Sequence, residues 1–178
     1  MKNILIVSGH TDLNNSVANK NILNELKENV PNIEFDILSE LYPDYKIDVD
    51  KEQEKLLGAD IIVLQYPVFW YSMPSLLEKW MEDVFKHGFS HGSTGDKLKG
   101  KKLIVSLTTG APEETYTNIN DFLNPIKATC KLCQMEYVDS IVTYGVSYQI
   151  RDEKNDEIIE KTNKHVNELI EILKEEEE

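Results

Sequence analysis

The sequence predicts an α/β protein with one central sheet of parallel strands and helices on both of its faces. Short apolar runs of strand length alternate with longer amphipathic segments almost from one end of the chain to the other. No internal repeat and no Gly/Ser-rich linker interrupts this alternation, so residues 1–178 are expected to form a single domain. A chain of 178 residues, 40% of them hydrophobic, is also long enough to bury a sizeable core.

The first part of the chain contains two strand patterns and two helix patterns. Residues 3–8 form a continuous apolar run, which is typical of a strand buried on both faces. Residues 16–29 place apolar side chains three and four positions apart and predict an amphipathic helix. Residues 33–38 alternate as a second strand, and the irregular link 42–50 leads to a short helix at 51–57.

The rest of the chain continues the alternation with three more strands and three more helices. Pro74 marks the start of the helix after the third strand, because proline is well tolerated in the first helical turn. The strands are expected at residues 60–66, 103–108 and 138–144, and the helices at residues 74–85, 119–132 and 152–173.

Two strand orders suit such a chain: the flavodoxin-like order 2-1-3-4-5 and half of a Rossmann fold. The loop after the first strand helps to choose between them. A Rossmann loop requires Gly-x-Gly-x-x-Gly, whereas residues 8–16 contain Gly9 and no second glycine. The sequence therefore favours a flavodoxin-like three-layer sandwich with a five-stranded parallel sheet of order 2-1-3-4-5.

The same loop has the composition of a phosphate site. It is rich in hydroxyl, amide and imidazole groups and opens a helix near Ser16, where free backbone N–H groups attract an anion. Ser16 also suits a plain helix cap, and the two roles can coexist. Residues 95–101 have the glycine spacing of a Walker loop, but Lys102 and a strand follow them, so no nucleotide site is expected there.

Two further loops are expected at the same edge of the sheet. Residues 67–71 form an aromatic turn that offers a flat wall to a flat ring system, although a buried strand end with core aromatics is the alternative. Thr108, Thr109 and Gly110 follow the fourth strand and expose backbone N–H groups and small side chains. Together the three loops predict a site for flavin mononucleotide, with its phosphate at the first loop and its ring against the other two.

Composition excludes some functions. The formal charge of −13 and a single arginine, Arg151, argue against a nucleic-acid-binding protein, which needs clustered basic side chains. Cys130 and Cys133 fall in phase with the apolar stripe of a helix, so they are expected to pack in the core rather than to act in redox chemistry or bind zinc. Without a signal peptide or a long apolar span, the expected location is the reducing cytoplasm.

The ordered series of motifs resembles the flavodoxin-fold NAD(P)H:quinone oxidoreductases, the DT-diaphorase-like family. The resemblance is greatest to its short bacterial branch of NAD(P)H oxidoreductases, general stress proteins and potassium-efflux ancillary subunits. It covers nearly the whole chain and is carried by His10, Ser16-Val17-Ala18-Asn19-Lys20, Leu41-Tyr42-Pro43-Asp44, Ile47-Asp48, Gln65 to Pro74, Leu76 to Trp80, Gly88-Phe89-Ser90-His91-Gly92, Leu98 to Lys101 and Thr108-Thr109-Gly110.

The resemblance implies a set of site residues. Those implied to contact the flavin phosphate are His10, Ser16 and Ala18. Those implied to hold the ring are Pro67, Val68, Phe69, Trp70, Tyr71, Thr108, Thr109, Gly110 and Tyr116, with Tyr116 as the candidate catalytic residue that stabilises the reduced flavin. Those expected to form the substrate pocket are Phe69, Tyr71, Phe89 and His91. His91 stands where an aromatic residue is common in the family, which leaves the acceptor preference open.

The resemblance also implies the reaction. Hydride would pass from NADH or NADPH to a bound flavin, expected to be FMN with FAD as the alternative, and two electrons would then go to a quinone or similar acceptor in a ping-pong sequence. A homodimer is expected, since members of the family build their sites at a two-fold interface. A redox-sensing ancillary subunit of a potassium-efflux transporter is the second hypothesis, and a one-electron flavodoxin shuttle is the third.

Overall fold

The computed structural model describes residues 2–177, which contain one five-stranded sheet of order β2-β1-β3-β4-β5 with every neighbouring pair parallel. This is the predicted flavodoxin-like order. At the centre, Ser8 on β1 pairs with Ile37 on one side and with Gln65 on the other. The strands are β1 (Ile4–Ser8), β2 (Ile33–Ile37), β3 (Ile61–Pro67), β4 (Lys102–Thr108) and β5 (Glu136–Thr143).

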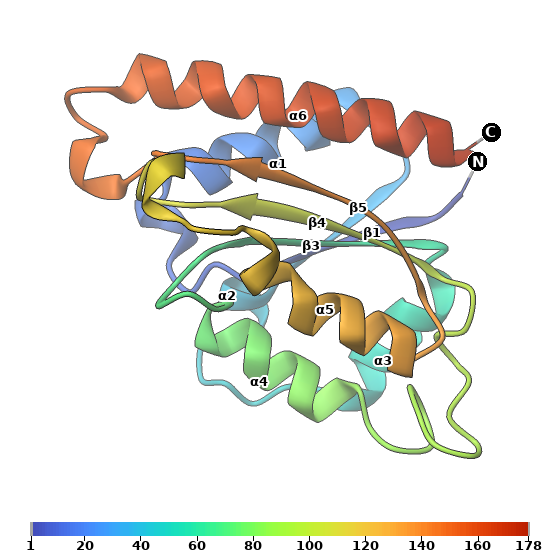
Figure 1. Cartoon of the computed structure of the whole chain (residues 1–178). Helices are drawn as coiled ribbons and strands as arrows, with labels where there is room; N and C mark the ends of the chain where they lie inside the picture. The colour runs from blue at the N-terminus through green and yellow to red at the C-terminus, as the bar shows by residue number, and fades with distance from the viewer. Residues whose placement is uncertain (1, 178) are drawn as a thin grey trace.

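Helices cover both faces of the sheet, which gives the three layers seen in Figure 1. One face carries α1 (Val17–Asn29) and α6 (Asn155–Glu177), which lie against each other. The other face carries α2 (Leu38–Leu41), α3 (Val49–Gly58), α4 (Ser75–Val84) and α5 (Asn120–Leu132). Because β1 and β3 lie in the middle of the sheet, they are buried along their whole length.

Each face of the sheet has its own apolar core, because successive side chains of a strand point in opposite directions. Leu5 and Val7 of β1 belong to the core under α2–α5, whereas Ile4 and Ile6 belong to the core under α1 and α6. Both cysteines of the chain are free, buried and part of the first core, so the expectation that they pack is confirmed.

The main difference from the predicted elements is the short helix α2. The alternating pattern extended the second strand to residue 38, but the strand ends at Ile37 and the chain turns at once into α2. Leu38 is fully buried in the core, and its carbonyl accepts a hydrogen bond from the backbone N–H of Tyr42 at 2.8 Å. Burial of Leu38 therefore satisfies the strand pattern and the helix equally well, and periodicity alone could not separate them.

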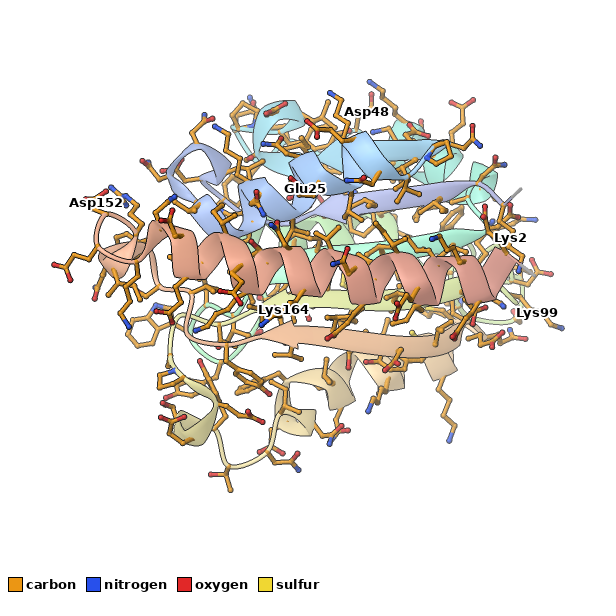
Figure 2. The ribbon with its side chains drawn as sticks, turned by 90° about the horizontal axis from the view of Figure 1, so that it is seen from above. Lys2, Glu25, Asp48, Lys99, Asp152 and Lys164 are labelled. Atoms are coloured by element: carbon orange, nitrogen blue, oxygen red, sulfur yellow. The ribbon has the colours of Figure 1, made fainter. Side chains whose placement is uncertain are left out.

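The two ends of the sheet carry different loops. The carboxyl ends of the strands, at the left of Figure 1, meet the loops that precede α1 and follow β3, β4 and β5. The segment between α4 and β4 lies at the opposite end, at the lower right. In the view from above, Asp152 of the loop before α6 lies at one end of the molecule, whereas Lys2 and Lys99 lie at the other (Figure 2).

Candidate functional site

A cavity of about 600 Å³ lies at the carboxyl edge of the sheet, where four loops meet. Its volume falls within the range of about 300–1,000 Å³ that is usual for small-molecule sites. The loop after β1 and the first turn of α1 contribute polar side chains, and the end of β3 contributes apolar ones. The residues that line it are His10, Thr11, Asp12, Asn15, Ser16, Asn19, Pro67, Val68, Phe69, Thr108, Thr109, Gly110, Val146, Ser147, Tyr148 and Arg151.

The loop after β1 is held close to the sheet by Gly9. Its backbone N–H donates to the carbonyl of Gln65 at 2.9 Å, and a Cβ at Gly9 would lie 2.7 Å from the Leu77 side chain of α4. A larger residue would push the loop away from α4, so glycine is required there by packing. Ser16 then caps α1, because its Oγ accepts from the backbone N–H of Asn19 at 3.1 Å.

His10 is a neutral hydrogen-bond donor toward the cavity. Its Nδ1 lies 3.0 Å from the backbone N–H of Asp12 and accepts that hydrogen, which places the ring proton on Nε2. Burial lowers the pKa of His10 below its ordinary value of 6.5, and the nearby charge of Asp12 only partly offsets this. The ring lies edge-on to Phe69, with 5.6 Å between the ring centroids.

The aromatic segment after β3 is a tight two-residue turn. The backbone groups of Phe69 and Ser72 exchange hydrogen bonds of 2.9 and 3.0 Å, and the two residues between them, Trp70 and Tyr71, have φ angles of 51° and 62°. This left-handed backbone usually selects Asn and Gly. Trp70 is 95% exposed and Tyr71 66% exposed, so the turn holds two large aromatic side chains in solvent at a cost in backbone strain.

The loops after β4 and β5 support each other across the cavity. Thr109 donates its backbone N–H to the carbonyl of Thr143 and accepts at its own carbonyl from the N–H of Val146, both at 2.9 Å. Its hydroxyl donates to the carbonyl of Ala111 at 2.7 Å. These bonds bring Ser147 and Arg151, from the loop after β5, to the lining of the cavity, with Arg151 beside the start of α1.

The sequence matches the family described as having a flavodoxin-like fold over residues 2–169. This chain belongs to that family. The uncharacterised NAD(P)H oxidoreductase YrkL of Bacillus subtilis (strain 168) is 36% identical over 160 residues, which cover 86% of this chain and 91% of that protein. KefF of Enterobacter sp. (strain 638), a glutathione-regulated potassium-efflux system ancillary protein, is 38% identical over 140 residues, covering 76% and 79% of the two chains.

Solved structures give the same result for the fold of this flavodoxin-like protein. General stress protein 14 of Treponema denticola, crystallised in complex with FMN, superposes with a TM-score of 0.85 and 25% identity over 96% of this chain and 99% of that one. An NADPH-quinone reductase from P. pentosaceus superposes with a TM-score of 0.73 and 25% identity, covering 94% and 99% of the two chains.

Eight of the twelve residues expected to bind the cofactor line the cavity of this flavodoxin-like chain: His10, Ser16, Pro67, Val68, Phe69, Thr108, Thr109 and Gly110. Four do not. Ala18 packs behind the wall against Val146, and Trp70 points into solvent. Tyr71 and Tyr116 line a neighbouring hollow of about 500 Å³ with Phe122.

Phe89 and His91 are not brought to the cavity. Both lie in the segment between α4 and β4, at the opposite end of the sheet. Phe89 packs against the core under α2–α5, and His91 Nδ1 lies 2.9 Å from the hydroxyl of the buried Ser90. Within one chain, the expected pocket of Phe69, Tyr71, Phe89 and His91 is therefore not assembled, because α4 runs the length of the sheet before this segment begins.

Sequence reasoning missed the loop after β5 and the side chain of Asn19. The lone arginine of an acidic chain was a usable signal for Arg151, which lies beside the start of α1. Within residues 2–177, no cluster of three or more His, Cys, Asp or Glu side chains could hold a metal ion, and no helix has the length and apolar content needed to cross a bilayer.

Proposed function

We propose that this protein is an FMN-dependent NAD(P)H:quinone oxidoreductase. The observation that carries the proposal is the cavity itself, which joins a polar pocket at the start of α1 to an apolar wall at the end of β3. The relative from Bacillus subtilis is named an NAD(P)H oxidoreductase, and the two structural relatives are an FMN complex and an NADPH-quinone reductase. These names support both the cofactor and the reaction class.

The residues of the cavity suit a flavin mononucleotide. Ser16, together with the first backbone N–H groups of α1, would hold the phosphate, and Arg151 supplies a positive charge beside them. Pro67, Val68 and Phe69 would lie against the ring. Gly110 lies beside the expected ring position, and a Cβ there would make only an ordinary contact with Ser147 at 3.7 Å, so packing within the chain does not require the glycine.

A bound flavin supplies two-electron chemistry, taking a hydride from a reduced nicotinamide and passing both electrons to an acceptor. The protein binds, orients and excludes water, and no side chain of the cavity needs to act as a covalent nucleophile. We infer that Tyr116 stabilises the reduced ring or orients the substrate from the neighbouring hollow, where it packs edge-on against Phe122 with 5.3 Å between centroids.

We also propose a homodimer. Trp70 and Tyr71 are large, exposed and close to the cavity, and a partner chain would cover them. A second copy is also the way in which Phe89 and His91 could contribute to a substrate pocket, since in their own chain they lie far from it. We place the protein in the cytoplasm, where NADH and NADPH are available.

The second candidate function is that of an ancillary subunit of a potassium-efflux transporter. It is favoured by the similarity to KefF, which is named for that role. In this case the same cavity and flavin would serve to sense redox state, and the partner would be a membrane protein.

The test is to purify the full chain, reconstitute it with FMN and measure oxidation of NADH and of NADPH with a soluble quinone. We expect one flavin per chain and parallel initial-rate plots at several quinone concentrations, because nicotinamide and quinone would occupy the same space in turn. Protein that stays colourless after gel filtration with FMN and with FAD would contradict the proposal. Protein that binds flavin but oxidises neither nicotinamide with any quinone would favour the transporter subunit, to be checked by co-purification.

A further inference from the structure

A buried chain of hydrogen bonds runs through Asn19 and connects opposite walls of the cavity. Asn19 is 3% exposed, and its Nδ2 donates to Ser16 Oγ at 3.0 Å. Its Oδ1 accepts from the hydroxyl of Thr108 at 3.2 Å and from Nε2 of the fully buried Gln65. Gln65 Oε1 in turn accepts from the hydroxyl of Ser8 at 3.1 Å. One side chain thus links α1 to the ends of β3 and β4.

The count of donors and acceptors fixes what Ser16 can offer a ligand. A hydroxyl has one hydrogen to donate and two lone pairs to accept. Ser16 Oγ already accepts twice, from the backbone N–H and from Nδ2 of Asn19. Its hydrogen remains, and Ser16 lines the cavity. Ser16 is therefore held as a donor, which is the polarity that an anionic phosphate requires.

The same count gives Thr108 the opposite polarity. Its hydrogen is used in the bond to Asn19 Oδ1, so only lone pairs remain on the hydroxyl. Thr108, the last residue of β4, also lines the cavity. Toward a ligand it is an acceptor, and it suits the N–H group of a flat heterocyclic ring.

We propose that Asn19 is a positioning residue that sets the hydrogen-bond polarity of the cavity, holding Ser16 as a donor for a phosphate and Thr108 as an acceptor for a ring N–H. This inference rests on the proposed flavin function. Its physical basis is the buried, satisfied network, because an amide fixed at both ends cannot turn without leaving buried groups unpaired. Reversal of both the Asn19 and the Gln65 amides would invert these polarities, and the experiment separates the two arrangements.

The decisive variant is Asn19→Asp, which replaces the Nδ2 donor by an oxygen and keeps an acceptor for Thr108 and Gln65. The hydroxyl of Ser16 would then donate to the new carboxylate instead of the ligand. Titrating flavin-free full-length protein with FMN, and with riboflavin, which lacks the phosphate, should show FMN affinity lowered about ten- to a hundredfold. Riboflavin affinity should change by less than about twofold.

Two controls separate positioning from simple charge repulsion. Asn24→Asp makes the same change in charge on the same helix, at an exposed position, and should leave the ratio of FMN to riboflavin affinity unchanged. In a Ser16→Ala background, Asn19→Asp should have little further effect, because the donor that it misdirects is already gone. If Asn19→Asp lowered FMN affinity by the same factor in the wild-type and the Ser16→Ala backgrounds, charge repulsion would explain the loss and the proposal would be overturned.

Two more variants test the other end of the network and guard against a folding defect. Thr108→Val should weaken FMN and riboflavin by the same factor, and Asn19→Ser, which cuts both arms, should weaken both ligands and FMN the more. Equal loss of FMN and riboflavin in Asn19→Asp, or a loss of riboflavin alone, would overturn the inference while leaving the flavin function intact. Wild-type protein that binds neither ligand would overturn the flavin function itself.

Discussion

Arg151 is the residue whose charge bears most directly on the cavity. It is the single arginine of a chain with a formal charge of −13, and it lines the cavity beside the start of α1. Its contacts within the chain are weak: Nη1 donates to the carbonyl of Tyr148 at a long 3.4 Å, the guanidinium lies 5.8 Å from the Tyr148 ring centroid, and Nε lies 3.9 Å from a carboxylate oxygen of Asp152. It is therefore free to pair with a ligand phosphate.

We predict that Arg151→Gln lowers FMN affinity several-fold to about tenfold and leaves riboflavin affinity nearly unchanged, because the lost partner is charged and partly exposed to solvent. Added salt should weaken FMN binding to the wild type more than to the variant, since screening acts on the removed charge. Lys164→Gln, which removes the same charge from an exposed site on α6, is the matched control. Equal salt dependence in the wild type and Arg151→Gln would contradict a phosphate contact.

Individual residues show how far the sequence could predict this site. His10, Ser16 and Thr108 were predictable because each follows a recognisable strand, and the carboxyl ends of parallel strands share one edge. Asn19 was not singled out, since a polar residue one turn into a helix has the pattern of a solvent-exposed position until the neighbouring strands are placed. Phe89 lies in the segment between α4 and β4, away from the cavity of its own chain, so its place in a substrate pocket stays a prediction that depends on a second copy of the chain.

Among the elements, the turn at residues 69–72 departs most from local backbone preferences. Left-handed φ angles cost about 1–2 kcal/mol for each residue that is not glycine, and Trp70 and Tyr71 both adopt them. Asn-Gly is the dipeptide that this backbone conformation favours. The strain is retained at the rim of the cavity, where the two aromatic side chains are exposed.

We predict that the double substitution Trp70→Asn with Tyr71→Gly raises the melting temperature by a few degrees, because the relief of strain at two residues, about 1–2 kcal/mol each, exceeds the loss of the ring contacts of Tyr71 with Tyr116 and Phe122, about 0.5–1.5 kcal/mol each. Activity with NAD(P)H and quinone, and the dimer if one forms, should be impaired because the exposed rings are lost. Gln134→Gly is the control, since Gln134 has a φ of 57° and follows α5, remote from the cavity. A less stable double variant would contradict the strain in the turn, and an equally active one would contradict its functional role.

The elements themselves were largely predictable, and their exceptions have local causes. The inner strands β1, β3 and β4 follow from apolar runs, which are typical of strands buried on both faces, and the edge strand β2 follows from its alternating pattern. The helix α2 was missed because Leu38 and Tyr42 are both buried at a spacing that suits a helical turn as well as the end of a strand. The predicted helix cap at Ser16 is confirmed, and Pro74, taken as the start of its helix, is the residue that precedes the first turn of α4.

At the scale of the whole molecule, each face of the sheet contains a buried titratable group. As pH rises, the two groups change the free energy of unfolding in opposite directions. Under α6, His165 bridges Ser106 at 2.7 Å and Thr143 at 2.9 Å, and burial lowers its pKa to about 4. Under α3, Asp36 lies beside Glu52 and Lys55; burial, then the neighbouring carboxylate of Glu52, raises the pKa of Asp36 to about 7. One oxygen of Asp36, Oδ2, is buried without a hydrogen-bond partner.

Glu52 explains why Asp36 takes up the proton. Burial by itself would raise the pKa of Glu52, but hydrogen bonds involving Asp36, Lys55, Tyr42 and Trp80 outweigh it and lower the pKa. Tyr42 donates at 2.6 Å, Lys55 at 2.7 Å and Trp80 at 2.8 Å. Glu52 thus stays ionised, and Lys55 cannot fully neutralise a second carboxylate beside it.

These shifts set opposite slopes of stability against pH. Between about pH 4 and 6.5, unfolding lets His165 take up a proton, so its contribution to stability rises with pH. Between about pH 4 and 7, the folded protein holds a proton on Asp36 that the unfolded chain releases, so this contribution falls as pH rises. Each would change the unfolding free energy by about 1.4 kcal/mol per pH unit, and together they should largely cancel in the wild type.

We predict that Asp36→Asn removes the falling slope, so that stability rises with pH from about 4 to 6.5 and exceeds that of the wild type above about pH 7. His165→Gln should do the reverse and leave a protein that loses stability as pH rises to about 7. Urea unfolding at intervals across this range measures both slopes, with Asp50→Asn, an exposed carboxylate on the same helix as Glu52, as the control. Parallel pH profiles for wild type and Asp36→Asn would mean that Asp36 is ionised in the folded protein, and the buried Oδ2 would then need a donor from another source.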